Sequence, residues 1–187
     1  MIKQLKTLGL VLGTAALILG LSPALAQASA PLIAAEAGPA AAAAAPALET
    51  TRYADLFSIA FPVGWQVSEQ TNAPQLVADS AGANGSLPAM RTEVIWQDAP
   101  PREVVGQSLE TIQALGYTVI RYDAANIDGV TAVRLWVGEI PGELPNAFIT
   151  YVGYPTATAT ITSYYGDTPD NLDPVLMAIH QSFARSQ

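Results

Sequence analysis

The sequence contains no cysteine, one histidine and, beyond residue 6, no lysine. Without cysteine the chain forms no disulfide and has neither a cysteine-ligated zinc site nor a lipid-modified cysteine. Sixteen acidic residues against eight basic ones give a formal net charge of −8. This acidity disfavours nucleic acid and anionic membranes, while it suits solubility, a basic protein partner or divalent cations. We therefore expect no nucleic-acid partner, and a domain that is stabilised by its packed core.

Motifs that carry chemistry are also scarce. The sequence contains no Gly-x-Ser-x-Gly motif that would supply a nucleophilic serine for His180, so we interpret His180 as a surface or half-buried helix residue. The glycine-rich stretch 82–85 lacks the lysine of a phosphate loop, and Asp167, Asp170 and Asp173 lack the spacing of a calcium loop. Paired carboxylates brought together by the fold are the one catalytic arrangement that spacing leaves open. We therefore expect no enzyme, and no cofactor or metal site from the motifs.

The N-terminus has the pattern of a targeting segment. Two lysines precede the apolar stretch 8–21, and Pro23 and the triplet Ala24-Leu25-Ala26 follow it. The apolar core is shorter than the roughly 20 residues that cross a bilayer. We predict a signal peptide over residues 1–26 that is cleaved after Ala26, and hence an exported protein of a periplasm or thylakoid lumen, without a transmembrane segment in the mature form. An uncleaved N-terminal anchor is the alternative.

Residues 27–50 are rich in alanine and proline. The alanine run 40–45 stands between two prolines and is too short to hold a helix in water. We predict a disordered or semi-extended tether over this stretch. The folded domain then spans residues 51–187, which is enough for one domain and too little for two.

The domain opens with an alternating apolar stretch. Phe57 and Phe61 lie on one face of a predicted strand, Pro62 and Gly64 form a tight corner, and Trp65 resumes the alternation. We predict a hairpin with its aromatic side chains directed inward. The two helices predicted downstream are expected to help cover it.

The rest of the domain alternates between strand and helix periodicity. Strands are predicted over 75–79, 90–96, 117–125, 131–139, 147–154 and 156–165, with a hairpin turn at Asp128-Gly129. Helices are predicted over 101–115 and from residue 168, or only from 173 because of Pro174, to about 183. Sequential strands joined by short turns pair antiparallel, and each helix must bury its apolar stripe on the sheet. We predict an α+β fold, an α/β/α sandwich with a mainly antiparallel sheet and helices packed on its faces.

Two side-chain patterns accompany these elements. Val105, Leu109, Ile112 and Leu115 form the expected apolar stripe of the first helix. Threonine recurs at every second position of the strand 156–165. A threonine array can form an ice- or carbohydrate-binding face, but one strand makes no array, so we interpret these threonines as the polar outer face of a sheet.

Three of these stretches together resemble the PsbP family. They are the strand and corner with Phe57, Phe61, Pro62, Gly64 and Trp65, the turn at Asp128 and Gly129, and the terminal helix that closes on Ser182 and Phe183. The resemblance extends over residues 53–183. Each motif alone is moderately specific, and their order and spacing indicate the family.

This resemblance implies an α/β/α sandwich and a non-catalytic, extrinsic protein on the lumenal side of photosystem II. Such a protein aids assembly or helps to retain calcium and chloride at the oxygen-evolving centre, so calcium is implied by resemblance only. Plant members dock through many basic residues and cyanobacterial members are typically lipoproteins, whereas this domain has neither lysine nor cysteine.

The same fold occurs in a Ran-binding yeast protein and in envelope proteins of the LpqN and DcrB kind, so fold does not decide function. The alternative is therefore a general envelope module that binds a lipid, a glycan or a protein and is unrelated to photosynthesis. We expect a monomer whose partner is a membrane photosynthetic complex or another protein.

Overall fold

The computed structural model of the chain describes residues 46–80, 89–166 and 172–186, all within the compact unit Ala41–Gln187. The predicted signal peptide, most of the predicted tether, the stretch 82–85, Asp167 and Asp170 lie outside the described residues. Cleavage after Ala26 therefore stays a prediction.

Ten strands of the described chain form two separate antiparallel sheets. The larger sheet has the order β3-β4-β5-β9-β8-β7-β6, and the smaller one has the order β1-β2-β10. The strands are β1 (Leu48–Tyr53), β2 (Phe57–Pro62), β3 (Gln66–Glu69), β4 (Leu76–Asp79), β5 (Met90–Gln97), β6 (Thr118–Ile127), β7 (Val130–Gly138), β8 (Asn146–Gly153), β9 (Thr158–Tyr165) and β10 (Ala184–Arg185).

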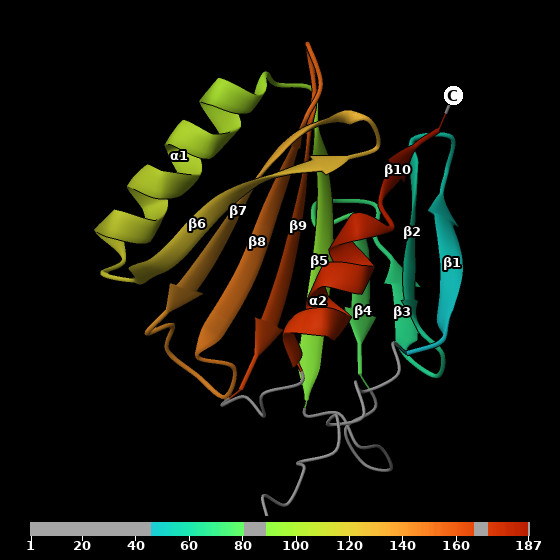
Figure 1. Cartoon of the computed structure of the whole chain (residues 1–187), viewed down its shortest axis with the longest axis horizontal. Coiled ribbons are helices and arrows are strands. Elements are labelled where there is room, and N and C mark those ends of the chain that lie inside the picture. Colours follow the sequence, from blue (N-terminus) through green and yellow to red (C-terminus); the bar gives the residue numbers. More distant parts are fainter. Residues whose placement is uncertain (1–45, 81–88, 167–171, 187) are drawn as a thin grey trace, which may run out of the picture. The chain divides into compact units, whose positions relative to one another are not determined.

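The two helices lie on opposite faces of the larger sheet (Figure 1). Helix α1 (Pro101–Ala114) packs through Val104 and Ile112 on the face that carries Ile149. Helix α2 (Leu172–Gln181) and the smaller sheet together cover the other face, where Ile179 and Ile161 share one core. The predicted α+β fold and its α/β/α layers are confirmed. The smaller sheet is an element that the local sequence pattern did not indicate.

The aromatic corner joins the two sheets. Strand β2 ends at Pro62, Gly64 has a φ of +91°, and the chain then enters β3 of the larger sheet. The predicted hairpin was wrong, because proline and a positive-φ glycine turn the chain out of the first sheet before it can pair with itself. Phe61 is buried, and Trp65 is half-buried with its ring centroid 6.1 Å from that of Phe61.

Strand β1 corrects the expected end of the tether. It begins at Leu48, which lies opposite Pro62, and continues through Thr50, which lies opposite Ala60. The last residues of the stretch 27–50 therefore belong to the folded domain. These residues are mostly polar and show no strand pattern by themselves, because the strand is stabilised by pairing with the aromatic strand β2.

The apolar stripe of α1 is shifted from its predicted position. Val104 and Ile112 are the buried residues, Val105 and Leu109 are half-buried, and Leu115 is 58% exposed. Leu115 is exposed because it stands at the C-cap of the helix, where the chain turns away toward β6. Helix α1 lies on the opposite face of the larger sheet, so the prediction that both helices cover the aromatic strand and corner was wrong for α1, and of the two helices only α2 packs there.

Candidate functional site

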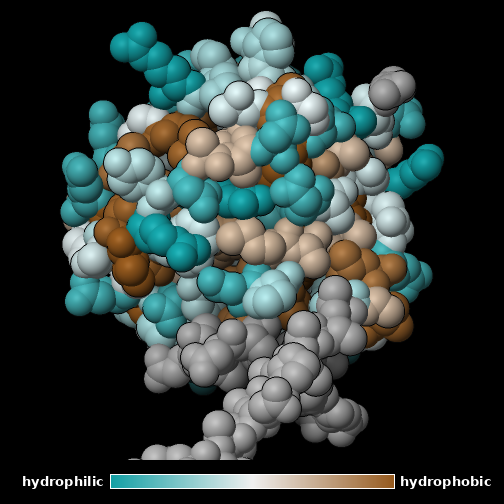
Figure 2. All heavy atoms as spheres, viewed as in Figure 1, coloured by the Kyte–Doolittle hydropathy of each residue, from teal (hydrophilic) through white to brown (hydrophobic). Residues whose placement is uncertain are grey.

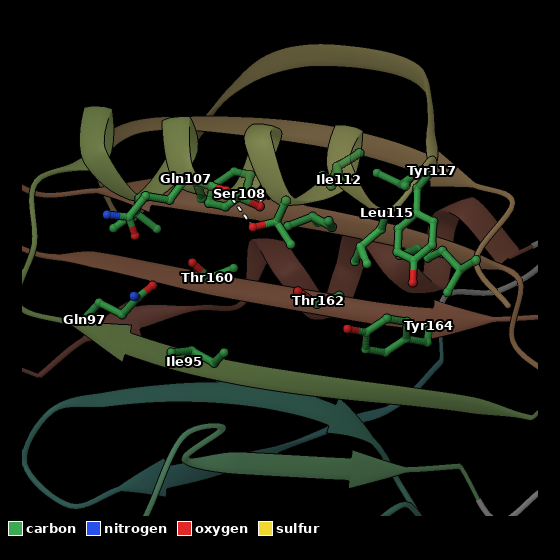
Figure 3. Close-up of a pocket in the computed structure, with 17 residues that line it drawn as sticks. Ile95, Gln97, Gln107, Ser108, Ile112, Leu115, Tyr117, Thr160, Thr162 and Tyr164 are labelled. Carbon is green, nitrogen blue, oxygen red and sulfur yellow. Dashed lines mark hydrogen bonds between the residues drawn. The ribbon is translucent and has the colours of Figure 1, made fainter. Parts of the chain in front are cut away.

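A cleft of about 450 Å³ opens between α1 and the larger sheet (Figure 3). Helix α1 stands over β7 and β8, while β9 and β5 form the uncovered side of the cleft. Gly153 on β8 fixes where the helix begins, because a Cβ at this position would lie 2.7 Å from Cγ of Pro101. A side chain there would push the start of α1 away from the sheet.

The cleft combines apolar surface with hydroxyl and amide groups. Its apolar lining consists of Ile95, Val104, Ile112, Leu115, Val137, Ile140, Ala147 and Ile149. Its polar lining consists of Gln97, Gln107, Ser108, Thr111, Tyr117, Tyr151, Thr160, Thr162 and Tyr164. None of these lining residues is Asp, Glu, Lys, Arg or His. Such a lining favours an uncharged ligand, because a charged one would lose its hydration without gaining a counter-charge.

Two tyrosine hydroxyls in the cleft are held in the neutral form. Burial raises the pKa of Tyr151, although its hydrogen bond with Ser108 of α1 acts in the opposite direction. Burial also raises the pKa of Tyr164, and the nearby carboxylate of Glu93 adds to that increase. Because a free tyrosine already titrates near pH 10, both phenols donate and accept hydrogen bonds without carrying charge at neutral pH.

Thr160 and Thr162 of β9 line the cleft instead of forming an outer face. Thr162 is buried, and Thr158 is buried with its hydroxyl donating to the carbonyl of Ala99 at 2.9 Å. Figure 3 shows Thr160 and Thr162 on the side of β9 that faces α1. Oγ1 of Thr160 is buried and has no hydrogen-bond partner among the described residues. A buried hydroxyl without a partner is unfavourable, and a ligand in the cleft is one means of satisfying it.

The residues of the aromatic and C-terminal motifs meet on the opposite side of the sheet. The rings of Phe57 and Phe183 lie 5.4 Å apart between centroids. Oγ of Ser182 accepts from the N–H of Ala60 at 2.8 Å and donates to the carbonyl of Ile179 at 2.6 Å. These contacts fasten the end of α2 to β2. None of the nine motif residues lines the cleft, so they act as scaffold.

The turn motif joins this scaffold. Asp128 and Gly129 have φ values of +54° and +73° between β6 and β7, as the predicted two-residue hairpin turn requires. Oδ2 of Asp128 accepts from the hydroxyl of Tyr154 at 2.7 Å and from the N–H of Arg185 at 3.0 Å. Burial and the Asp128 carboxylate raise the pKa of Tyr154. The turn therefore holds strand β10 in place.

His180 is fully buried, so the prediction of a surface or half-buried position was wrong. Its Nδ1 lies 2.7 Å from Oγ1 of Thr150 and its Nε2 lies 2.9 Å from Oγ of Ser163, which in turn lies 2.7 Å from Oγ1 of Thr92. Burial and, next, the positive charge of Arg134 lower the pKa of His180 to about 3. No described carboxylate bonds to the ring, so this hydroxyl network stabilises the core and lacks the acid that orients a catalytic histidine.

The described residues offer neither a cluster of metal ligands nor a membrane-spanning helix. They contain no group of three or more His, Cys, Asp or Glu side chains that could hold a metal ion. No helix in this part of the chain has the length and apolarity needed to cross a membrane.

Sequence reasoning missed the cleft because its lining comes from elements that are far apart along the chain. The one local signal was the threonine repeat of β9, since hydroxyls at every second position must share one face of a strand. The repeat did not reveal that a helix stands over that face. That arrangement depends on the long path of the chain from β5 through α1 to the far edge of the sheet.

No protein-family model and no curated protein sequence matches the chain. Its structure is similar to that of cyanobacterial PsbP from Synechocystis sp. PCC 6803, with 15% identity and a TM-score of 0.54, covering 74% of this chain and 92% of that protein. It is also similar to LpqN, which is involved in cell envelope biogenesis of Mycobacterium tuberculosis, with 16% identity and a TM-score of 0.54, covering 75% and 86% of the two chains. The chain therefore has the PsbP-like fold that its motifs predicted.

Proposed function

We propose that this chain is an exported, non-catalytic binding protein that takes a small, uncharged ligand in the cleft between α1 and the sheet. The observation that carries the proposal is the lining of the cleft, which has hydroxyl, amide and apolar groups but no acidic or basic side chain. Burial raises the pKa of Tyr151 and of Tyr164 in this lining, so these phenols stay neutral, whereas acid–base catalysis is most efficient with a group that titrates near the operating pH. The volume of about 450 Å³ suits a small molecule.

Ligand chemistry follows from the arrangement of the lining. Ile149 and Ile112 offer an apolar floor and wall, and Thr162 and Thr160 add hydroxyls, of which that of Thr160 is buried without a described partner. A molecule with an apolar body and at least one hydrogen-bonding group matches both the apolar residues and the hydroxyl groups of the lining. An ionised molecule does not, because the cleft supplies no opposite charge.

The test uses N-phenyl-1-naphthylamine, an uncharged fluorescent probe whose emission rises in apolar sites. Gln107→Trp places a bulky ring at an exposed position that lines the cleft, and we expect it to weaken probe binding roughly tenfold or more by filling the site. Gln113→Trp lies on the exposed side of the same helix outside the lining and serves as the matched control. Equal titration curves for the two variants would refute the proposal.

A second candidate is an extrinsic photosystem II-associated or assembly role on the lumenal or periplasmic side, as the resemblance to the PsbP family implies. The similarity to Synechocystis PsbP over 92% of that protein favours this candidate. Calcium belongs to it by resemblance only. The decisive measurement is co-purification with photosystem II from native membranes at low salt, and clean separation of the two would contradict it. A source without photosynthesis would instead favour an envelope module of the LpqN kind.

A further inference from the structure

The two edges of the larger sheet differ in length and exposure. Strand β3 has four residues, whereas β6 has ten, and residues 118–124 of β6 are all exposed. An edge strand presents unpaired backbone N–H and C=O groups, and natural proteins usually keep such edges short. The long edge at β6 is therefore the one that is able to accept another strand.

The hairpin geometry determines which backbone groups of β6 face outward. Ile127 closes the two-residue turn, and in such a turn the closing pair bonds to itself. Because bonding alternates along an antiparallel strand, Arg121 and Asp123 direct their backbone groups toward β7. Tyr122 and Ala124 consequently direct theirs away from the sheet. A partner strand would bond to these two residues.

The charges beside Tyr122 are self-complementary. Arg121 and Asp123 lie on the same face of β6 and are both exposed, and the Arg121 guanidinium stands 3.6 Å above the ring of Trp136. When a second β6 is aligned antiparallel with Tyr122 opposite Tyr122, each Arg121 lies opposite the Asp123 of the other copy. This is a non-hydrogen-bonded pair, in which facing side chains approach most closely.

The same charges disfavour the neighbouring registers. A shift by two residues in one direction places Arg121 opposite Arg121, and a shift in the other direction places Asp123 opposite Asp123. Like charges directly opposite one another destabilise a strand pair. The arrangement with Tyr122 at the centre is thus the one among these three that forms two ion pairs.

Exposed apolar side chains accompany this edge. Tyr122 is 75% exposed, Ile120 is 64% exposed, and Leu115 at the end of α1 is 58% exposed. Figure 2 shows hydrophobic residues at the surface on the side where α1 ends and β6 begins. A β-bulge between Val119 and Arg121 ends the regular part of the edge, so the pairing is centred on the regular residues beyond it.

We propose that a second copy of this chain pairs antiparallel along β6, with the twofold axis at Tyr122, so that the two larger sheets become one continuous sheet. The dimer replaces the monomer that we expected from the sequence. Leu115 borders both this surface and the cleft, but strand β6 contributes no residue to the lining of the cleft, so the proposal does not depend on the ligand.

The test is a charge-reversal series followed by sedimentation equilibrium of the chain over a range of concentrations. Arg121→Asp and Asp123→Arg each place like charges opposite one another, and each should raise the dimer dissociation constant roughly tenfold or more. The double variant R121D/D123R exchanges the two charges and should dimerise again. Arg102→Asp, at an exposed position of α1, changes the charge equally and should leave the dimer intact.

Mixing the two single variants gives a sharper readout. Each variant alone is expected to be monomeric, but an equimolar mixture restores opposite charges at both positions and should form a heterodimer. Heterodimer formation also shows that the variants are folded, although Arg121→Asp loses the contact with Trp136 and the ion pair with Asp173, whose oxygen lies 3.9 Å from the guanidinium. A parent chain that stays monomeric at every concentration, or a mixture of folded variants that does not associate, would overturn the proposal.

Discussion

The two faces of the larger sheet are covered in different ways. On one face, α2 and the smaller sheet close two core clusters, in which Phe57 and Phe183, and Phe148, are fully buried. On the other face, a single helix leaves an open cleft beside Thr160. The first face holds most of the buried apolar residues, whereas the second keeps an open space and one buried hydroxyl without a described partner. Substitutions should therefore have large effects on stability at the closed face and small ones at the open face.

The largest effect is expected at the aromatic contact of the closed face. Phe183→Ala removes a ring that is 1% exposed and packs on Phe57, and should lower the free energy of unfolding by about 3–5 kcal/mol. Leu115→Ala at the open face removes a side chain that is 58% exposed and should cost less than about 0.5 kcal/mol. Urea denaturation measures both. Similar losses for the two variants would remove the distinction between the faces.

The second effect is a pH dependence that belongs to the closed face. His180 is neutral in the folded protein with a pKa of about 3, while a free histidine titrates near 6.5. Below pH 6.5 the unfolded chain therefore binds a proton that the folded chain does not, so stability decreases as the pH falls toward 3 and is constant above about 7. Between pH 7 and pH 5 the loss should be about 2 kcal/mol.

This pH range isolates the single histidine of the chain, because most carboxylates titrate below it. His180→Gln keeps polar groups near Thr150 and Ser163 but does not titrate, so its free energy of unfolding should change little between pH 7 and pH 5. Denaturation curves of both proteins at each pH provide the comparison. An unchanged slope in the variant would show that His180 is not the group responsible.

The last comparison concerns the effect on stability of removing one threonine hydroxyl from each face. Thr160→Val replaces a buried hydroxyl that has no described partner, and should change the free energy of unfolding by less than about 1 kcal/mol in either direction. Thr150→Val is the matched substitution on the closed face, where the hydroxyl contacts His180, and should destabilise by about 1–3 kcal/mol. If Thr160→Val were the more damaging variant, its hydroxyl would have a structural partner and the cleft would lose its candidate ligand contact.

Much of the secondary structure could be predicted because it depends on local rules. Alternation located β5 and β9, and the apolar stripe located α2. The dipeptide Asp128-Gly129 located the turn, since these residues tolerate the positive φ that a tight hairpin requires. The corner at Pro62 and Gly64 was also recognised as a corner, but the residues that pair on either side of it were not. Pairing depends on partners elsewhere in the chain, which a local pattern does not contain.

The sequence by itself determined the elements, the acidic charge, the absence of disulfides and the resemblance that led to the PsbP-like fold. Only the tertiary structure decided that β2 pairs with β10, that His180 is buried between Thr150 and Ser163, and that Thr160 and Thr162 line a cleft beside α1. The physical reason is that burial and pairing arise from contacts between residues that are distant along the chain. A histidine on an amphipathic helix and a threonine on an alternating strand have the same local pattern whether they face water, a core or a cleft.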